Sequence, residues 1–212
     1  MQAMNERGIG KVQLLYPTTT KAFPAVYGEV NTPGATQTII FKAHYDGQPV
    51  NASQWAKGLA PFTPVLLNAS LEKNGSGIEF PTKEKAYDPQ WRIYGRGASD
   101  DKAGVMAIIN AYDAIVKSGM KPTVNIKFFF EGEEEAGSDH LFEILQQHSP
   151  LLQSDLWIIC DGPVHQSGLK QVVFGVRGDA HVDITVYGIK RPLLSGLYVN
   201  WAPNPAMMLS QL

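Results

Sequence analysis

One histidine and six acidic residues stand in four short groups along the chain, each group next to an apolar run or a glycine-rich turn. The residues are His44, Asp46, Asp100, Asp101, Glu134, Glu135 and Asp161. Carboxylate oxygens with few imidazoles suit Zn²⁺, Mn²⁺ or Co²⁺. Acidic side chains gathered in a folded interior need a positive charge to neutralise them, and a metal pair provides one. The pattern therefore predicts a two-metal site that activates a water molecule for hydrolysis.

Each group has a simpler explanation when it is taken alone. His44 and Asp46 share one face of an extended segment, as a core histidine with an acidic partner would. Asp100 at a helix start is a capping residue by type. The acidic cluster around Glu134 is typical of a solvated loop, and Asp161 before glycine and proline is typical of a turn. The order of all the groups together carries the metal prediction.

The elements that must position these residues alternate between strands and helices. Strands are predicted over residues 11–16, 25–30, 36–43, 123–130 and 156–160, and helices over residues 101–119 and 138–148. Asp100 is the predicted cap of the first helix and Gly119 its stop. The alternation favours an α/β fold, a mainly parallel twisted sheet with helices on both faces. Acidic residues that follow such strands meet at one edge of the sheet, where these folds bind ligands.

Two further segments complete the chain. Residues 51–88 are rich in Pro, Gly, Asn and Ser and are predicted to form a long loop with at most a short hairpin. So long an irregular segment in a compact domain is usually functional. After Arg177 and Gly178 we expect a strand over residues 180–187 and the start of a helix over residues 205–212. The chain is therefore expected to end partway into a second domain.

Composition narrows the class of protein. The 212 residues include 44% hydrophobic and 18% charged residues, with a formal net charge of −2. This balance is that of an ordinary globular protein and gives no electrostatic reason to expect nucleic acid or an anionic membrane as partner. No apolar run approaches the ~20 residues of a membrane span. The single cysteine, Cys160, is expected to be a small buried hydrophobe. We expect a cytoplasmic location.

Three sequence words resemble one known family. They are His-Tyr-Asp-Gly-Gln-Pro at residues 44–49, Gly-Arg-Gly-Ala-Ser-Asp-Asp-Lys-Ala-Gly at residues 95–104, and Glu-Gly-Glu-Glu-Glu-Ala-Gly-Ser at residues 131–138. They are similar to metallopeptidase family 20, the aminoacylase, carnosinase and carboxypeptidase G group, and most of all to its carnosinase-like dipeptidases. The resemblance spans roughly residues 10–212. It implies a zinc-peptidase-like sheet followed by the start of an inserted α+β lid domain.

The resemblance also implies a set of metal ligands. Asp100 would bridge two divalent metal ions, most often Zn, with Mn or Co as the other choices. His44 and Asp161 would bind one metal, and Glu135 would bind the other. The family's last ligand is a histidine far downstream, in a part of the catalytic domain that these 212 residues do not reach.

The implied reaction is hydrolysis of an amide bond in a small peptide, as in a dipeptidase or carboxypeptidase, or in an N-acyl amino acid. Glu134 would be the general base, and Asp46 would orient His44. The peptide bond between Asp100 and Asp101 is typically cis in the family. Residues 1–178 would be the N-terminal part of the catalytic domain, and residues 179–212 the truncated beginning of a lid that forms homodimers in full-length members.

One departure concerns the lid. The family usually has His-Ser-Gly at a lid loop, where the histidine helps to polarise the substrate carbonyl; here Leu194 stands in that place. Leucine can neither donate a hydrogen bond nor carry a charge. We therefore expect the 212-residue chain alone to be inactive or nearly so. The alternatives are a degenerate homologue that binds metal without turnover, and an aminopeptidase of a related two-zinc family, which the wording of residues 45–49 argues against.

Overall fold

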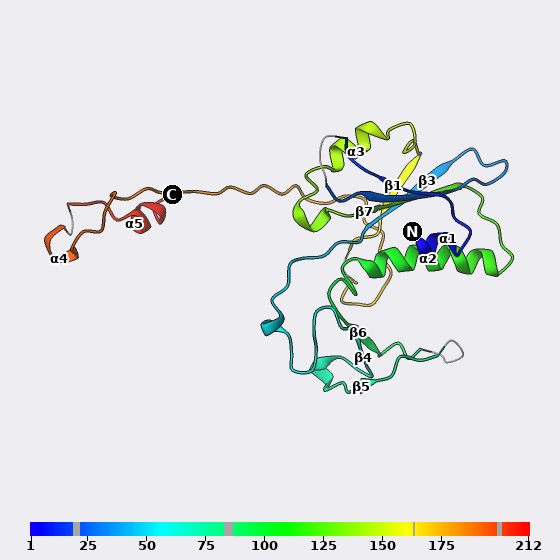
Figure 1. The fold of residues 1–212 in the computed structure, drawn as a ribbon, viewed down its shortest axis with the longest axis horizontal. Helices are drawn as coiled ribbons and strands as arrows, with labels where there is room; N and C mark the ends of the chain where they lie inside the picture. The colour runs from blue at the N-terminus through cyan, green and yellow to red at the C-terminus, as the bar shows by residue number, and fades with distance from the viewer. Residues whose placement is uncertain (19–21, 83–86, 163, 199–200) are drawn as a thin grey trace. The chain divides into compact units, whose positions relative to one another are not determined.

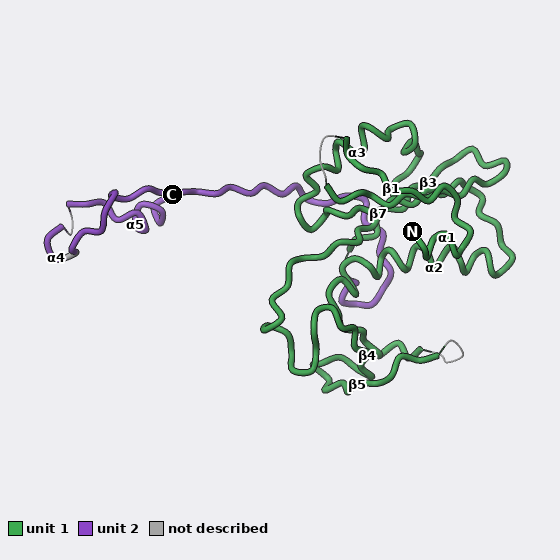
Figure 2. Tube along the Cα trace, viewed as in Figure 1, with its two compact units in different colours: residues 1–163 green, residues 164–212 purple. Residues whose placement is uncertain are grey.

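The computed structural model describes residues 1–18, 22–82, 87–162, 164–198 and 201–212. It divides into two compact units, Met1–Pro163 and Val164–Leu212 (Figure 2). All the candidate site residues lie in the first unit. The assignment of residues 1–178 to a catalytic domain and of residues 179–212 to a lid stays a prediction.

A five-stranded sheet forms the centre of the first unit. Its strands are β1 (Gly10–Leu15), β2 (Ala25–Val30), β3 (Thr38–His44), β7 (Asn125–Glu131) and β8 (Leu156–Ile159), in the order β1-β2-β7-β3-β8. β3 pairs in parallel with β7 and β8, whereas β1–β2 and β2–β7 are antiparallel. The sheet is therefore mixed, and the prediction of a mainly parallel sheet is wrong for its β1–β2 side. The segment between β1 and β2 is shorter than the dozen or so residues that a parallel crossover needs.

Helices cover both faces of this sheet, as predicted (Figure 1). They are α1 (Gln2–Asn5) and α2 (Lys102–Lys117) on one face, and α3 (Leu141–Gln147) on the other. Successive phenylalanines of β7 point to opposite faces because side chains alternate along a strand. Phe128 and Phe130 join the cluster that contains Ile109 of α2, and Phe129 joins the cluster that contains Ile144 of α3. The apolar run of β7 thus fills two cores and fixes the sheet between its helices.

Helix α2 begins at Lys102, one residue later than predicted. Its N-cap is Asp101, and the Asp101 side chain makes no capping hydrogen bond. The prediction that Asp100 caps the helix is therefore wrong: the Asp100 carboxylate contacts His44 instead. The helix ends at Lys117, and Gly119 follows with φ of 79°, a left-handed conformation that favours glycine at a helix end.

The segment predicted as a long loop with a short hairpin contains two strands of a second sheet, and the third strand follows it. Strands β4 (Val65–Leu67), β5 (Gly77–Ile78) and β6 (Arg92–Tyr94) form an antiparallel sheet in the order β5-β4-β6. The short helix η1 (Ala52–Gln54) precedes β4 along the chain, and η2 (Leu71–Lys73) lies between β4 and β5. Leu66 and Leu67 are buried although they belong to a strand of only three residues. Strands this short give too few alternating positions to be recognised from sequence.

The second unit contains two short helices, α4 (Ser195–Tyr198) and α5 (Pro205–Leu209). The start of a helix at Pro205 is confirmed. The strand predicted over residues 180–187 is wrong: this described segment has no strand pairing, and a strand needs a neighbour to satisfy its backbone groups. Val182 and Tyr187 in this segment are 78% and 83% exposed. Among the described helices, none is long and apolar enough to cross a membrane.

A buried carboxylate on β2 makes the stability of the first unit depend on pH. Glu29 is 7% exposed, and its oxygens contact Lys11 Nζ at 2.6 Å, Tyr27 Oη at 2.7 Å and Asn31 Nδ2 at 2.8 Å. Burial alone would raise the pKa of Glu29, but these three donors outweigh burial and hold the pKa below its usual value. Ionised Glu29 therefore stabilises the fold above the unfolded-state pKa, and this contribution is lost as the pH falls through the folded-state pKa.

We expect the melting temperature of the chain to fall as the pH is lowered from about 5 to 3, and part of that fall to disappear in Glu29→Gln. Glutamine keeps the size of the side chain and an oxygen acceptor but does not titrate. The measurement is thermal unfolding of both proteins across this pH range. An equal fall in the two proteins would show that Glu29 contributes nothing to the acid sensitivity.

Candidate metal centre

His44 is the centre of the site. It is the last residue of β3, its side chain is 1% exposed, and both ring nitrogens face carboxylates. Nδ1 lies 3.1 Å from Asp46 Oδ1, and Nε2 lies 2.9 Å from Asp100 Oδ1. The two-residue period of the extended chain places His44 and Asp46 on one side, as the sequence predicted. The imidazole is thereby held from one side and directed at Asp100 from the other.

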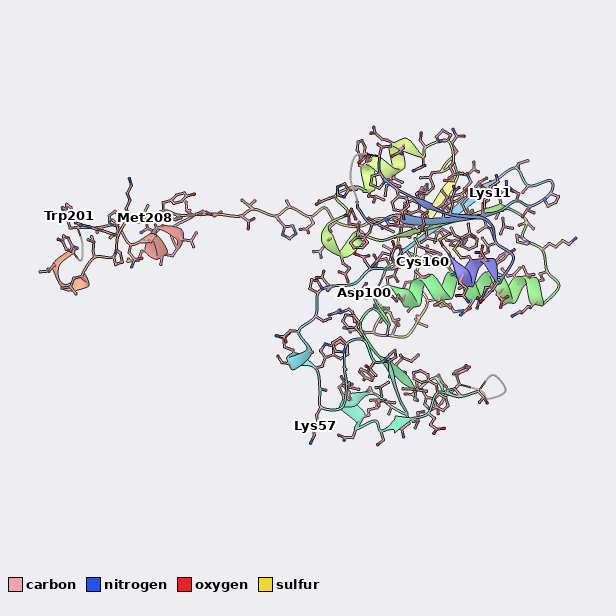
Figure 3. The ribbon with its side chains drawn as sticks, in the orientation of Figure 1. Lys11, Lys57, Asp100, Cys160, Trp201 and Met208 are labelled. Atoms are coloured by element: carbon pink, nitrogen blue, oxygen red, sulfur yellow. The ribbon has the colours of Figure 1, made fainter. Side chains whose placement is uncertain are left out.

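Two more carboxylates from other elements face the same ring nitrogen. His44 Nε2 lies 3.7 Å from Glu134 Oε2 and 3.8 Å from Asp161 Oδ2. Glu134 begins the short helix η3 (Glu134–Ala136) after β7, and Asp161 follows β8. Asp100 stands close to the first turn of α2 (Figure 3). One ligand atom each from His44, Asp100 and Asp161 lies within 4.8 Å of the other two, a spacing that one metal ion fits.

Glu135 stands outside that trio and is anchored to the loop after β3. Its backbone N–H donates to Asp46 Oδ2 at 3.0 Å. Gln48 Nε2 donates to Glu135 Oε2 at 2.6 Å and lies 3.3 Å from its backbone oxygen. Asp46 thus contacts both the imidazole of His44 and the backbone of Glu135. The sequence analysis missed Gln48, although it lies in the first motif.

Asp101 is a second residue without an assigned role. It is 5% exposed, and its Oδ2 accepts a hydrogen bond from the backbone N–H of His44 at 3.1 Å. The peptide bond between Asp100 and Asp101 is cis, which confirms the expectation taken from the family resemblance. The signal that could have identified Asp101 was the second acid of the pair, which a helix cap does not require.

The electrostatics of the site show an excess of negative charge. Burial alone would lower the pKa of His44, but the nearby Asp161 and Glu134 carboxylates outweigh burial and raise it. The pKa of Glu134 is raised first by burial and also by Asp161, and burial raises the pKa of Asp101. A positive charge added to the site would therefore stabilise the ionised carboxylates of Glu134 and Asp101. Imidazole nitrogen and carboxylate oxygen are zinc ligands, so the donor set fits the metal that the sequence predicted.

Gly132 lies in the turn between β7 and Glu134, where the chain packs closely against Tyr45. A Cβ at this position would overlap the Tyr45 hydroxyl oxygen and lie 2.9 Å from the backbone oxygen of Pro24. We expect Gly132→Ala to destabilise the chain by about 1–3 kcal/mol, the usual cost of overpacking. Gly77→Ala is the control because a Cβ there meets open space. Urea unfolding measures both variants, and equal stability of Gly132→Ala and wild type would contradict this packing.

Comparison with known proteins decides the family. The sequence pattern of peptidase family M20/M25/M40 matches residues 40–196, nearly three quarters of the chain, and this stretch contains every candidate site residue. The chain belongs to this family. Among its relatives, the Cys-Gly metallodipeptidase dug1 of Schizosaccharomyces pombe is 29% identical over 184 residues, which are 86% of this chain and 34% of that protein. The human Beta-Ala-His dipeptidase is 29% identical over 166 residues, 77% of this chain and 28% of that protein.

Solved structures agree with this assignment. An M20 family metallo-carboxypeptidase from Sulfolobus solfataricus superimposes with a TM-score of 0.58 at 30% identity, covering 79% of this chain and 32% of that one. The dipeptidase Dug1p of Saccharomyces cerevisiae gives a TM-score of 0.60 at 21% identity, covering 99% of this chain and 42% of that one. At this identity the likeness supports a shared fold and nothing further. The chain spans about a third of the length of the curated relatives it matches.

Proposed function

We propose that this chain carries the metal-binding and water-activating part of a hydrolase that cleaves the amide bond of a small peptide. The convergence of His44, Asp100, Glu134 and Asp161 on one point is the observation that supports it; they end β3, precede α2, begin η3 and follow β8, respectively. His44 and Asp161 lie 117 positions apart along the sequence, so no local charge pattern explains their meeting. Membership of the M20/M25/M40 family supports the same reaction class.

The side chains present divide into two metal-binding groups. His44, Asp100 and Asp161 would hold one ion. Glu135 would serve a second ion, which Asp100 would share. Two such ions, when bound, lower the pKa of water and polarise the carbonyl of the scissile amide. With a metal bound, Nδ1 of His44 would donate to Asp46, at 3.1 Å, and Nε2 would be the unprotonated ligand nitrogen. Gln48 holds one oxygen of Glu135 and leaves the other free.

Glu134 is the proton carrier in this proposal. Its carboxylate lies beside the metal-binding group, at 3.7 Å from His44 Nε2, and is 36% exposed, so water and substrate reach it. A carboxylate whose pKa is raised by burial holds a proton more readily than an ordinary glutamate, as a general base requires. Glu134 takes the proton of the attacking water and returns it to the leaving amine.

Dipeptides are the proposed substrate class because two of the relatives described above are dipeptidases, one for Cys-Gly and one for Beta-Ala-His. N-acyl amino acids are a second class. A succinyl-diaminopimelate desuccinylase of Coxiella burnetii, 29% identical over 172 residues, favours it. Leu194 is 69% exposed and offers no donor to a substrate carbonyl. We therefore propose that the 212-residue chain binds metal but cleaves either substrate only at a trace rate.

Isothermal titration of the metal-free chain with Zn²⁺ tests the metal part of this proposal. Hydrolysis of Cys-Gly and of an N-succinyl amino acid by the zinc-loaded chain tests the substrate part. We expect zinc binding, and a metal-dependent trace of dipeptide cleavage that EDTA removes. A well-folded chain that binds no zinc would contradict the proposal. Faster cleavage of the N-succinyl substrate would assign the second class.

A further inference from the structure

Asp101 completes a closed ring of contacts around the metal-binding group. Its Oδ2 accepts the backbone N–H of His44 at 3.1 Å, and Nε2 of His44 lies 2.9 Å from Asp100 Oδ1. Asp100 is bonded covalently to Asp101. The ring thus links the main chain of His44, its imidazole and the neighbouring carboxylate, across 56 positions of sequence. The proposed reaction gives no role to Asp101 itself.

The hydrogen bond to Asp101 replaces a missing strand contact. The pairing of β3 with β8 ends at Lys42 and Ile159, and the last contact on that side is from Cys160 N–H to the backbone oxygen of Lys42 at 2.7 Å. Alternate N–H groups of a strand point to opposite neighbours, and the N–H of Tyr45 donates to β7. The N–H of His44 therefore points to the β8 side, beyond the end of that strand. The carboxylate of Asp101 satisfies it there.

Packing holds the Asp101 side chain in this position. A Cβ at Gly104 would overlap Asp101 Oδ1 and would lie 2.5 Å from the backbone oxygen of Cys160. The carboxylate is thus enclosed between the first turn of α2 and the end of β8, and it is 5% exposed. Among the residues that the structure describes, none forms an ion pair with this carboxylate. Burying an unpaired carboxylate is costly, which argues that its acceptor function is needed.

We propose that Asp101 is a positioning residue that fixes the distance between the His44 imidazole and the Asp100 carboxylate, and thereby the affinity for metal. This inference rests on the proposed function, because it assumes that His44 and Asp100 share a metal ion. Partners that orient metal ligands typically change metal affinity 10–100-fold when they are removed. Asp101→Ala removes the acceptor, whereas Asp101→Asn keeps the shape and one acceptor oxygen without the charge.

The chain contains a matched control at the opposite end of β3. Asp155 Oδ2 accepts the backbone N–H of Thr38, the first residue of β3, at 2.7 Å. Asp155 and Asp101 therefore make the same kind of contact to the two ends of one strand, and only Asp101 lies at the metal-binding group. Asp155→Ala reports what the loss of such a contact does to stability alone.

The experiment combines zinc titration of each variant with thermal unfolding of its metal-free form. We expect Asp101→Ala to bind zinc 10–100-fold more weakly than wild type, with Asp101→Asn between the two. Asp155→Ala should lower the melting temperature and keep the zinc affinity within about threefold of wild type. If Asp101→Ala fails to fold, the comparison of Asp101→Asn with wild type and Asp155→Ala still measures the affinity.

Three outcomes would overturn the positioning role. An Asp101→Ala variant with wild-type zinc affinity would show that the ring does not matter. Equal affinities of Asp101→Asn and Asp101→Ala would assign the effect to charge. An equal loss in Asp155→Ala would assign it to general stability. A wild-type chain that binds no zinc would instead refute the proposed function, so the two failures are distinguishable.

Discussion

Zinc binding should fall by at least about 100-fold when His44 is replaced with alanine, because the substitution removes a ligand and not merely a partner that orients one. The imidazole contributes the one nitrogen of the trio and stands within 4 Å of four carboxylates. Without it, these acids repel one another across a cavity of imidazole size. Titration of the metal-free variant with Zn²⁺ measures the effect.

His148→Ala is the control for this result. His148 lies just after α3, on the other face of the sheet, and its Nε2 faces the backbone oxygen of Tyr16 at 3.3 Å. The control should bind zinc as wild type does. If His44→Ala keeps its zinc and His148→Ala loses it, the metal centre does not lie at the end of β3.

Glu134→Gln should lower the trace cleavage of Cys-Gly by roughly 10²–10⁴-fold, the usual contribution of a general base. The amide keeps the shape of the side chain but cannot accept the proton of the attacking water. Zinc affinity should stay near that of wild type because Glu134 is proposed to bind no metal. Long incubations of concentrated zinc-loaded chain with Cys-Gly measure the turnover.

The neighbouring acid offers the matched comparison. Glu133 Oε2 faces His140 Nδ1 at 2.8 Å and not the imidazole of His44. Glu133→Gln should therefore leave the turnover nearly unchanged. If Glu133→Gln loses activity and Glu134→Gln keeps it, the base has been assigned to the wrong residue. Robust turnover by the wild-type chain would refute our expectation that Leu194 and the shorter length limit it.

The sequence predicted the strands that run through the core better than those at its margins. β2 was predicted to the residue because its apolar pattern is bounded by proline and glycine turns. β3 extends through His44, one residue beyond its prediction, since a histidine does not continue an apolar run. The direction of β2 relative to β7 was not predictable from either strand, because local patterns do not specify partners. Strand pairing was also what the segment 180–187 lacked.

The site was predictable in its residue types and not in its contacts. Motif order placed His44, Asp100, Glu134 and Asp161 at strand ends, and the structure brings their side chains together. Gln48 was missed, and Asp101 was singled out without a role, because neither role is recognisable without its partner: one contacts Glu135, and the other contacts a backbone N–H. A side chain that serves a main-chain group leaves no pattern in the sequence.

The central place of β3 has a consequence for how the chain folds. Its two neighbours in the sheet, β7 and β8, follow it by more than 80 residues. β3 can therefore pair on both sides only after most of the first unit has been synthesised. Pairings between such distant segments form slowly. The proposed metal ligands His44, Asp100 and Asp161 are consequently not brought together until β8 docks. We expect zinc uptake during refolding to report the moment at which β8 joins the sheet.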